Sequence, residues 1–232
     1  MQDDHGPVYV IGDIHGRLDL LDRAIDAIRR DDAHKKNVGT AITLGDYIDR
    51  GPSSRGVVDR LADNPFEMPF VALKGNHEVL FEDFLANPEV GEHWRALGGL
   101  ETLHSYGVPA RLLMVGNYEE AAASLRTALP SKHLDFLQSL RMSYEHGKYF
   151  FCHAGVRPGV PLERQNEEDL IWIRDEFLNS KMDFGKIVVH GHTPVHEPEV
   201  LPNRINLDTG AFATGKLTCL VLEGPRHRFL TL

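Results

Sequence analysis

The sequence predicts an α/β protein in which central β-sheets are flanked by helices. Three short apolar runs are each followed within a few residues by glycine and then Asp or Asn, as buried strands with polar carboxyl ends are. These runs cover residues 8–11, 41–44 and 70–73. Apolar residues recur at helical spacing from Leu18 to Ile28, and a second helical pattern begins near Val79. The order is therefore β-α-β-α-β.

The second half of the chain returns to strands. Apolar runs cover residues 148–152, 186–189, 204–208 and 217–222. Alternation of Leu217, Cys219 and Val221 predicts that the last of these strands buries one face. Leu170, Ile173 and Phe177 have the spacing of a helix.

Size and composition limit the class of protein. With 232 residues and 42% hydrophobic content, the chain fits a single domain over residues 1–232. A net charge of -9 predicts no basic surface and no nucleic-acid partner. No apolar window approaches the roughly 18 residues of a membrane span, and Met1 to Gly6 shows no leader pattern. We therefore expect a cytoplasmic protein with no membrane partner; the sequence indicates no oligomeric state.

Residues 92–140 form a helical subdomain in this interpretation. The best helices are residues 118–129 and 131–140, which Pro130 separates. We find no chemically distinctive residue there and expect a packing and substrate-shaping role. Cys152 and Cys219 lie in apolar runs, so we expect buried free thiols. Surface exposure would explain His133 and several other histidines.

Three segments carry the chemistry. They are Gly12-Asp13-Ile14-His15-Gly16, Gly45-Asp46-Tyr47-Ile48-Asp49-Arg50-Gly51 and Gly75-Asn76-His77-Glu78. Any one of them could be an ordinary turn, because Gly, Asp and Asn are common turn residues. Together, at the carboxyl ends of successive strands, they indicate a ligand site, since that edge of an open α/β sheet is where ligands bind.

These segments resemble the signature of the phosphoprotein phosphatase branch of the calcineurin-like metallophosphoesterases. The likeness continues through Cys152-His153-Ala154-Gly155, Trp172-Ile173-Arg174 and Gly191-His192-Thr193-Pro194. Pro194 stands where other branches carry a second ligand histidine. The length, the run His93-Trp94 and the closing Leu207-Asp208-Thr209-Gly210 are similar to bacterial and bacteriophage lambda-type serine/threonine protein phosphatases. The resemblance implies the calcineurin-like metallophosphoesterase fold, with the site at the carboxyl ends of strands.

The resemblance also implies two metal ions and a metal-bound hydroxide as the nucleophile. Asp13 and His15 would hold one ion, Asn76, His153 and His192 the other, and Asp46 would bridge them. Carboxylate, amide and imidazole ligands suit manganese or iron, and the absence of ligand cysteines argues against a structural zinc site. We expect Mn²⁺, or an Fe/Mn or Fe/Zn pair in the cell.

The catalytic roles follow from the same resemblance. His77 would be the general acid, and Asp49 would orient its ring. Arg50 and Arg174 would bind the phosphate, although Arg174 lies on a helical pattern where a surface arginine would be unremarkable. Glu78 is explained as a helix first-turn acid that accepts backbone N–H groups. His190 has no counterpart in the family pattern, and we expect a buried histidine with one hydrogen bond.

Three functions remain open on the sequence. The first is a serine/threonine protein phosphatase that acts on phosphorylated proteins, because the Asp49-Arg50 pair is intact where related symmetrical diadenosine tetraphosphatases typically alter the Asp. The second is such a tetraphosphatase, or an enzyme for another small phosphoester. The third is a non-catalytic binding module, which the complete set of expected ligands disfavours.

Overall fold

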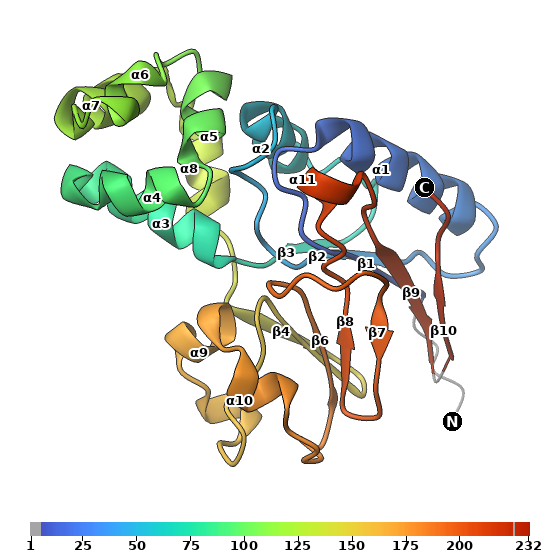
Figure 1. Cartoon of the computed structure of the whole chain (residues 1–232). Coiled ribbons are helices and arrows are strands. Elements are labelled where there is room, and N and C mark those ends of the chain that lie inside the picture. The colour runs from blue at the N-terminus through green and yellow to red at the C-terminus, as the bar shows by residue number, and fades with distance from the viewer. Residues whose placement is uncertain (1–5, 225) are drawn as a thin grey trace.

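The computed structural model describes residues 6–224 and 226–232. Met1 to His5, which the search for a leader included, lie outside the described residues. The described chain contains two five-stranded mixed sheets with helices on their outer faces (Figure 1). The expected α/β class with central sheets flanked by helices is confirmed.

The first sheet has the order β10-β9-β1-β2-β3. Its strands are β1 (Val8–Ile11), β2 (Thr40–Thr43), β3 (Phe70–Ala72), β9 (Cys219–Glu223) and β10 (Arg226–Phe229). β1, β2 and β3 are parallel, whereas β9 and β10 are antiparallel additions. Parallel neighbours need a crossover connection, and α1 (Leu18–Asp32) and α2 (Ser54–Ala62) supply the two crossovers. The three parallel carboxyl ends therefore meet at one edge.

The second sheet has the order β4-β5-β6-β8-β7. Its strands are β4 (Ser143–His146), β5 (Tyr149–Cys152), β6 (Ile187–His190), β7 (Glu199–Val200) and β8 (Arg204–Asn206). β5, β6 and β8 are parallel. The 3-10 turn η2 (Leu162–Arg164) and the helices α9 (Glu167–Trp172) and α10 (Asp175–Leu178) follow β5, and both helices lie beside this sheet (Figure 1).

The sheets face each other across an apolar core. Val10 and Leu220 of the first sheet belong to the same buried cluster as Phe151 and Val189 of the second. Cys219 and Val221 instead join the cluster that contains α1 and α2. The prediction that this strand buries one face was therefore wrong: β9 buries both, because helices cover one side and the second sheet covers the other.

A helical lobe lies between β3 and β4 in the sequence (Figure 1). It consists of α3 (Asn76–Ala86), η1 (Pro88–Val90), α4 (Gly91–Ala96), α5 (Gly99–Ser105), α6 (Arg111–Met114), α7 (Tyr118–Ala128) and α8 (Ser131–Gln138). Trp94 is fully buried and packs on Phe84, with ring centroids 4.6 Å apart. His133 is also fully buried, so the surface explanation for it was wrong; its ring lies 3.0 Å from both Tyr106 Oη and Asp59 Oδ1.

Both cysteines are buried and free, as expected. None of the helices in residues 6–224 and 226–232 is long and apolar enough to cross a membrane. A short helix near the carboxyl end, α11 (Ala211–Thr214), precedes β9 and completes the set of elements around the site.

Candidate active site

Nine of the ten residues singled out from the sequence lie just beyond the strands that precede them, and the tenth, Arg174, lies between two helices. Asp13 and His15 follow β1; Asp46, Asp49 and Arg50 follow β2; Asn76 and His77 follow β3; His153 follows β5; Arg174 lies between α9 and α10; and His192 follows β6. Contacts within hydrogen-bonding distance link each of them to at least one other. The carboxyl ends of both sheets therefore converge on one site.

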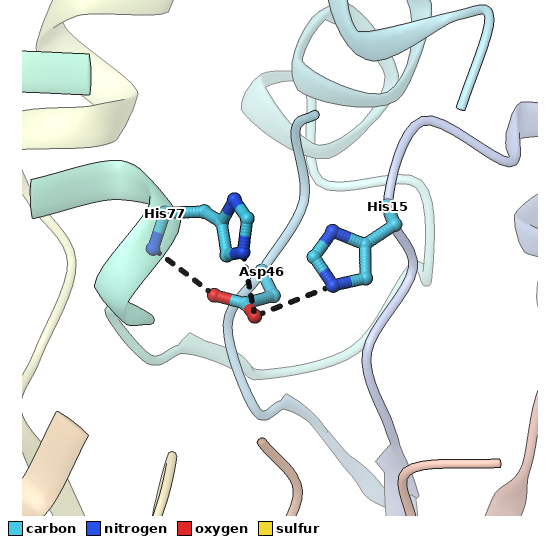
Figure 2. A group of neighbouring side chains, drawn as sticks. All are labelled: His15, Asp46 and His77. Carbon is cyan, nitrogen blue, oxygen red and sulfur yellow. Dashed lines mark hydrogen bonds and ion pairs between the residues drawn. The ribbon is translucent and has the colours of Figure 1, made fainter. Parts of the chain in front are cut away.

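Asp46 lies at the centre of this site (Figure 2). Its Oδ2 is 3.4 Å from His15 Nε2 and 3.9 Å from His77 Nε2. Its Oδ1 accepts the backbone N–H of His77 at 3.2 Å and lies 3.4 Å from His153 Nε2. The carboxylate is almost completely buried. One carboxylate thus lies beside His15 and His153, the expected ligands of different ions, a position that would suit a bridging ligand.

Backbone carbonyls orient two of these histidines. His15 Nδ1 lies 2.8 Å from the carbonyl of Ile48, and His153 Nδ1 lies 2.9 Å from the carbonyl of Leu44. When Nδ1 donates to a carbonyl, the lone pair is on Nε2, which in both rings faces Asp46. This outer hydrogen bond is the usual way in which a protein fixes a metal-binding imidazole.

Asn76 connects His153 to a further histidine, His192. Its Oδ1 lies 3.0 Å from His153 Nε2 and 2.9 Å from His192 Nδ1. His192 also donates its backbone N–H to Asp13 Oδ2 at 3.0 Å. These contacts bring the expected ligands of the second ion together and connect them to Asp13.

Asp13 supplies the clearest sign that a cation belongs here. Its Oδ1 is buried without a hydrogen-bond partner, an arrangement that costs free energy in a protein interior. A Cβ built on Gly191 would lie only 1.9 Å from this oxygen, so glycine is needed at that position. Burial and the neighbouring Asp208 carboxylate raise the pKa of Asp13 well above its usual range.

The electrostatics of the histidines also fit metal binding. Burial lowers the pKa of His15 to about 3 and that of His192 to about 2, so both rings are neutral near pH 7. Burial opposes a charge on His153 as well, but the carboxylates of Asp46 and Asp13 outweigh it and raise its pKa to about 10. That excess of negative potential is what a bound cation would neutralise.

Among the residues that the structure describes, two groups of side chains have ligand atoms close enough to share an ion. They are His15, Asp46 and His77, and Asp46, His153 and His192, each within 4.8 Å. Asp46 belongs to both, in agreement with a two-metal site. The first group contains His77 and lacks Asp13, which differs from the ligand set that the sequence implied. Asp13 belongs to neither group, but its buried Oδ1 has no hydrogen-bond partner and is therefore available to an ion.

His77 and Asp49 form a buried pair beside this centre. His77 Nδ1 lies 2.7 Å from Asp49 Oδ2, and both side chains are fully buried. Burial opposes a charge on His77, but the carboxylates of Asp46 and Asp49 outweigh it and raise its pKa. Arg50 places Nη2 3.0 Å from His77 Nε2 and Nη1 3.0 Å from His15 Nε2. The guanidinium therefore faces the space between the two histidines.

Arg174 reaches the site because its helix is interrupted. The regular helical pattern predicted over this segment is divided into α9 and α10, and Arg174 lies between them with φ -131° and ψ -101°. Its Nε donates to His192 Nε2 at 3.1 Å. The side chain is otherwise exposed, which leaves donors free for a substrate.

The sequence did not reveal how several residues support the site. Trp94 and Thr102 of the helical lobe both donate hydrogen bonds to the Asp49 carboxylate. Glu78 accepts the N–H groups of Gly75, Asp46 and Tyr47 at 2.8 to 2.9 Å, so it holds two site loops together as well as its own helix. Partners so distant in the chain leave no local pattern that would have found them.

Phe212 is a further missed residue. It lies in α11 with 37% of its surface exposed. Its ring centroid is 4.9 Å from the guanidinium carbon of Arg50 and 5.4 Å from the His15 ring. The ring therefore packs on the predicted phosphate-binding arginine and still presents a surface to solvent.

His190 is a buried neutral residue outside the metal ligands. Its Nδ1 lies 3.1 Å from the carbonyl of Gly191, and its Nε2 is buried without a partner. Burial lowers its pKa to about 3. The ring packs edge-on against Phe177, which agrees with the single hydrogen bond expected from the sequence.

The backbone at the site adopts an uncommon conformation. Seven non-glycine residues of the described chain have positive φ, and five of them are His15, Asp46, Asp49, Arg50 and His192. Such conformations cost about 1 to 3 kcal/mol each and gather where a protein holds functional groups in place.

Comparison with known proteins agrees with this geometry. The profile of the calcineurin-like phosphoesterase family matches residues 6–214, and the chain belongs to that family. It is 28% identical to the bis(5'-nucleosyl)-tetraphosphatase PrpE [asymmetrical] of Anoxybacillus flavithermus, covering 91% of this chain and 88% of the relative. It is 26% identical to serine/threonine-protein phosphatase 2 of Escherichia coli, covering 91% and 90%.

A solved structure shows the same fold. It is described as a putative diadenosine tetraphosphatase and superimposes with a TM-score of 0.66, at 22% identity, over 99% of this chain and 95% of that one. The chain is therefore a metallophosphoesterase, with a constellation of His and Asp that indicates a dinuclear metal site.

Proposed function

We propose that this protein is a metal-dependent phosphatase that hydrolyses phosphoserine and phosphothreonine monoesters in proteins. The observation that carries the proposal is the buried His77-Asp49 pair, 2.7 Å apart, beside the Asp46 centre. Protonation of the leaving group matters most for a poor leaving group such as an alkoxide. A serine or threonine ester has such a leaving group.

Six residues would hold the metal ions. Asp13 and His15 would bind the first, Asn76, His153 and His192 the second, and Asp46 both. Two divalent ions there would neutralise phosphate charge and lower the pKa of the water that attacks phosphorus. The mixed oxygen and nitrogen ligands favour Mn²⁺, or an Fe/Mn or Fe/Zn pair.

The chain's own residues then divide the remaining work. Arg50 and Arg174 each turn a guanidinium toward the ligand cluster, where they would bind the non-bridging oxygens of the phosphoryl group. Asp49 fixes the ring of His77 through Nδ1, which leaves Nε2 as the atom that gives its proton to the ester oxygen. The attacking water would lose one proton to solvent as its oxygen bonds to phosphorus. The bond from phosphorus to the ester oxygen would break, and that oxygen would take the proton of His77, so that the alcohol leaves neutral.

A second candidate is hydrolysis of dinucleoside tetraphosphates. Two observations favour it: a relative named as a bis(5'-nucleosyl)-tetraphosphatase, and the half-exposed Phe212 ring, on which a flat nucleobase could stack. Against it, a phosphate leaving group has a low pKa and needs little protonation, so the His77-Asp49 pair would add less to its hydrolysis.

The two candidates are separated by kinetics under one set of conditions. With Mn²⁺ and at one pH, we expect kcat/KM to be higher for phosphoserine and phosphothreonine peptides than for diadenosine tetraphosphate. A clear reversal would assign the protein to the nucleotide hydrolases. Absence of turnover on both, in a protein shown to hold its metals, would contradict the phosphatase proposal.

A further inference from the structure

The helical lobe surrounds Asp49 with hydrogen-bond donors. Trp94 Nε1 donates to Asp49 Oδ2 at 3.0 Å, the same oxygen that faces His77 Nδ1. Thr102 Oγ1 donates to the other oxygen, Oδ1, at 2.6 Å and accepts the backbone N–H of Asp49 at 2.9 Å. The side chains of Asp49, Trp94 and Thr102 are all fully buried.

The loop between these two donors holds the neighbouring residue. The backbone N–H of Arg50 donates to the carbonyl of Gly98 at 3.1 Å, and its Nε donates to the carbonyl of Leu97 at 3.4 Å. Gly98 has φ +108°, and a Cβ on it would lie 2.6 Å from the backbone nitrogen of Arg50. The segment from Trp94 to Thr102 thus fits closely around the Asp49-Arg50 pair.

We propose that Trp94 and Thr102 are positioning residues for the phosphatase reaction. They act through Asp49: one donor on each oxygen prevents the carboxylate from rotating, so that Oδ2 stays aimed at His77 Nδ1 and the ring keeps Nε2 directed into the site. This inference rests on the proposed acid role of His77. It gives the helical lobe a part in catalysis in addition to packing.

The chemistry explains why two donors are needed. A carboxylate has two equivalent oxygens and can rotate to offer either of them to a partner. In a buried site each oxygen that lacks a donor also carries a desolvation cost of about 1 to 3 kcal/mol. Thr102 supplies the donor that Oδ1 would otherwise lack, and Trp94 gives Oδ2 a second donor beside His77, which holds the carboxylate in one orientation. Neither side chain would touch the substrate, so their effect should appear in kcat more than in KM.

Conservative substitutions test the inference. Trp94→Phe keeps an aromatic ring and removes the N–H, Thr102→Val keeps the shape and removes the hydroxyl, and Thr102→Ser restores it. With Mn²⁺ present, we expect Trp94→Phe and Thr102→Val to lower kcat roughly tenfold or more on a phosphoserine peptide, the scale of a lost hydrogen bond to a charged group. The loss on 4-nitrophenyl phosphate should be several-fold smaller, KM should stay within about twofold, and Thr102→Ser should recover most of kcat.

A matched control lies in the same lobe. Tyr106→Phe also removes a buried hydrogen bond while keeping the ring, but its partner is His133, so both substrates should keep near wild-type kcat. A double-mutant cycle adds a second readout, because in an Asp49→Asn background Trp94→Phe should lower kcat by less than about twofold. Urea unfolding identifies any variant that does not fold. The kinetics of the Trp94 and Thr102 variants are interpreted independently, so that one position still tests the inference if the other variant fails to fold.

The outcomes separate this inference from the proposed function. Equal losses on both substrates for Trp94→Phe and Thr102→Val, or wild-type kcat in both, would overturn the positioning role. If His77→Asn lowers kcat by the same factor on both substrates, the acid role of His77 is wrong, and the positioning role of Trp94 and Thr102 is wrong with it. If His77→Asn is selective and the lobe variants are not, only the inference drawn here is wrong.

Discussion

At the scale of single residues, adjacent side chains have different partners. Asn76 Oδ1 contacts His153 and His192, whereas His77 contacts Asp49 and Arg50. The start of α3 at Asn76 separates the directions of the two side chains. One short motif can therefore supply a metal ligand and a proton donor.

His77→Asn tests that division. We expect the variant to keep both metal ions and to lose about 10²- to 10⁴-fold in turnover on a phosphoserine peptide, the range for loss of a general acid. The loss should be smaller for an activated aryl phosphate, whose leaving group needs no proton. Metal analysis and kcat on the two substrates check this; equal losses on both would show that His77 is not the acid.

Asp46 has a different kind of importance, because it faces ligands of both expected ions. We expect Asp46→Asn to reduce the metal content more than Asp13→Asn, since the first weakens two sites and the second only one. Chelation of wild-type protein should abolish turnover, and Mn²⁺ should restore it. Full turnover in a sample verified to be free of metal would refute the two-metal mechanism, and two ions bound as tightly in Asp46→Asn as in the wild type would refute the bridging role of Asp46.

At the scale of elements, the sequence predicted the strands that carry the site and missed β4, β7 and β10, each of which lies at the edge of a sheet. β1, β2, β3, β5 and β6 are apolar runs followed by polar ligands, a pattern that is visible in one sequence. β4 and β10 contain no buried residue, and their sequences lack the apolar signal of a core strand. The helix expected around Arg174 is interrupted. Leu170, Ile173 and Phe177 nevertheless pack in one core cluster, and this shared burial explains why their spacing resembled that of a continuous helix.

The candidate site, like the strands that carry it, was predictable only where a local sequence pattern marks its residues. The residues expected to be ligands and the acid lie in contiguous motifs, so local pattern was enough to single them out as candidates. Trp94, Thr102 and Phe212 act through contacts with residues 45 to 162 positions away. The role of each depends on the tertiary fold, which a single sequence does not display.

The short helix α11 carries a prediction about substrate choice. Arg17 Nη1 donates to the carbonyl of Ala211 at 2.8 Å, which fixes the helix beside the site, with Phe212 half exposed. If a nucleobase stacks on this ring, Phe212→Leu should lower kcat/KM for diadenosine tetraphosphate about 3- to 10-fold more than for a phosphoserine peptide. Phe229→Leu is a matched control, because Phe229 is equally exposed on β10 and lies outside the site. The same change on both substrates would exclude stacking.

At the scale of the whole molecule, the site depends on the complete fold. The bond from the His192 N–H to Asp13 Oδ2 joins residues 179 positions apart and connects the two sheets. The helical lobe adds the contacts to Asp49 and Arg50. The two sheets and the helical lobe together restrain the site loops. Such restraint can maintain backbone conformations that an isolated loop would not keep, which accounts for the concentration of positive φ at the site.

Holding these conformations should lower the stability of the protein, and Arg50 offers a way to measure by how much. Its φ is +67°, where a residue with a Cβ is strained and glycine is not. Arg50→Gly and Arg50→Ala both remove the side chain, so their difference isolates the backbone. We expect the glycine variant to be more stable than the alanine variant by about 1 kcal/mol in urea unfolding. At the exposed Arg23, in the middle of α1, the order should reverse by about the same amount, because glycine is the poorer helix former. The same order at both positions would mean that the site backbone relaxes freely and stores no strain.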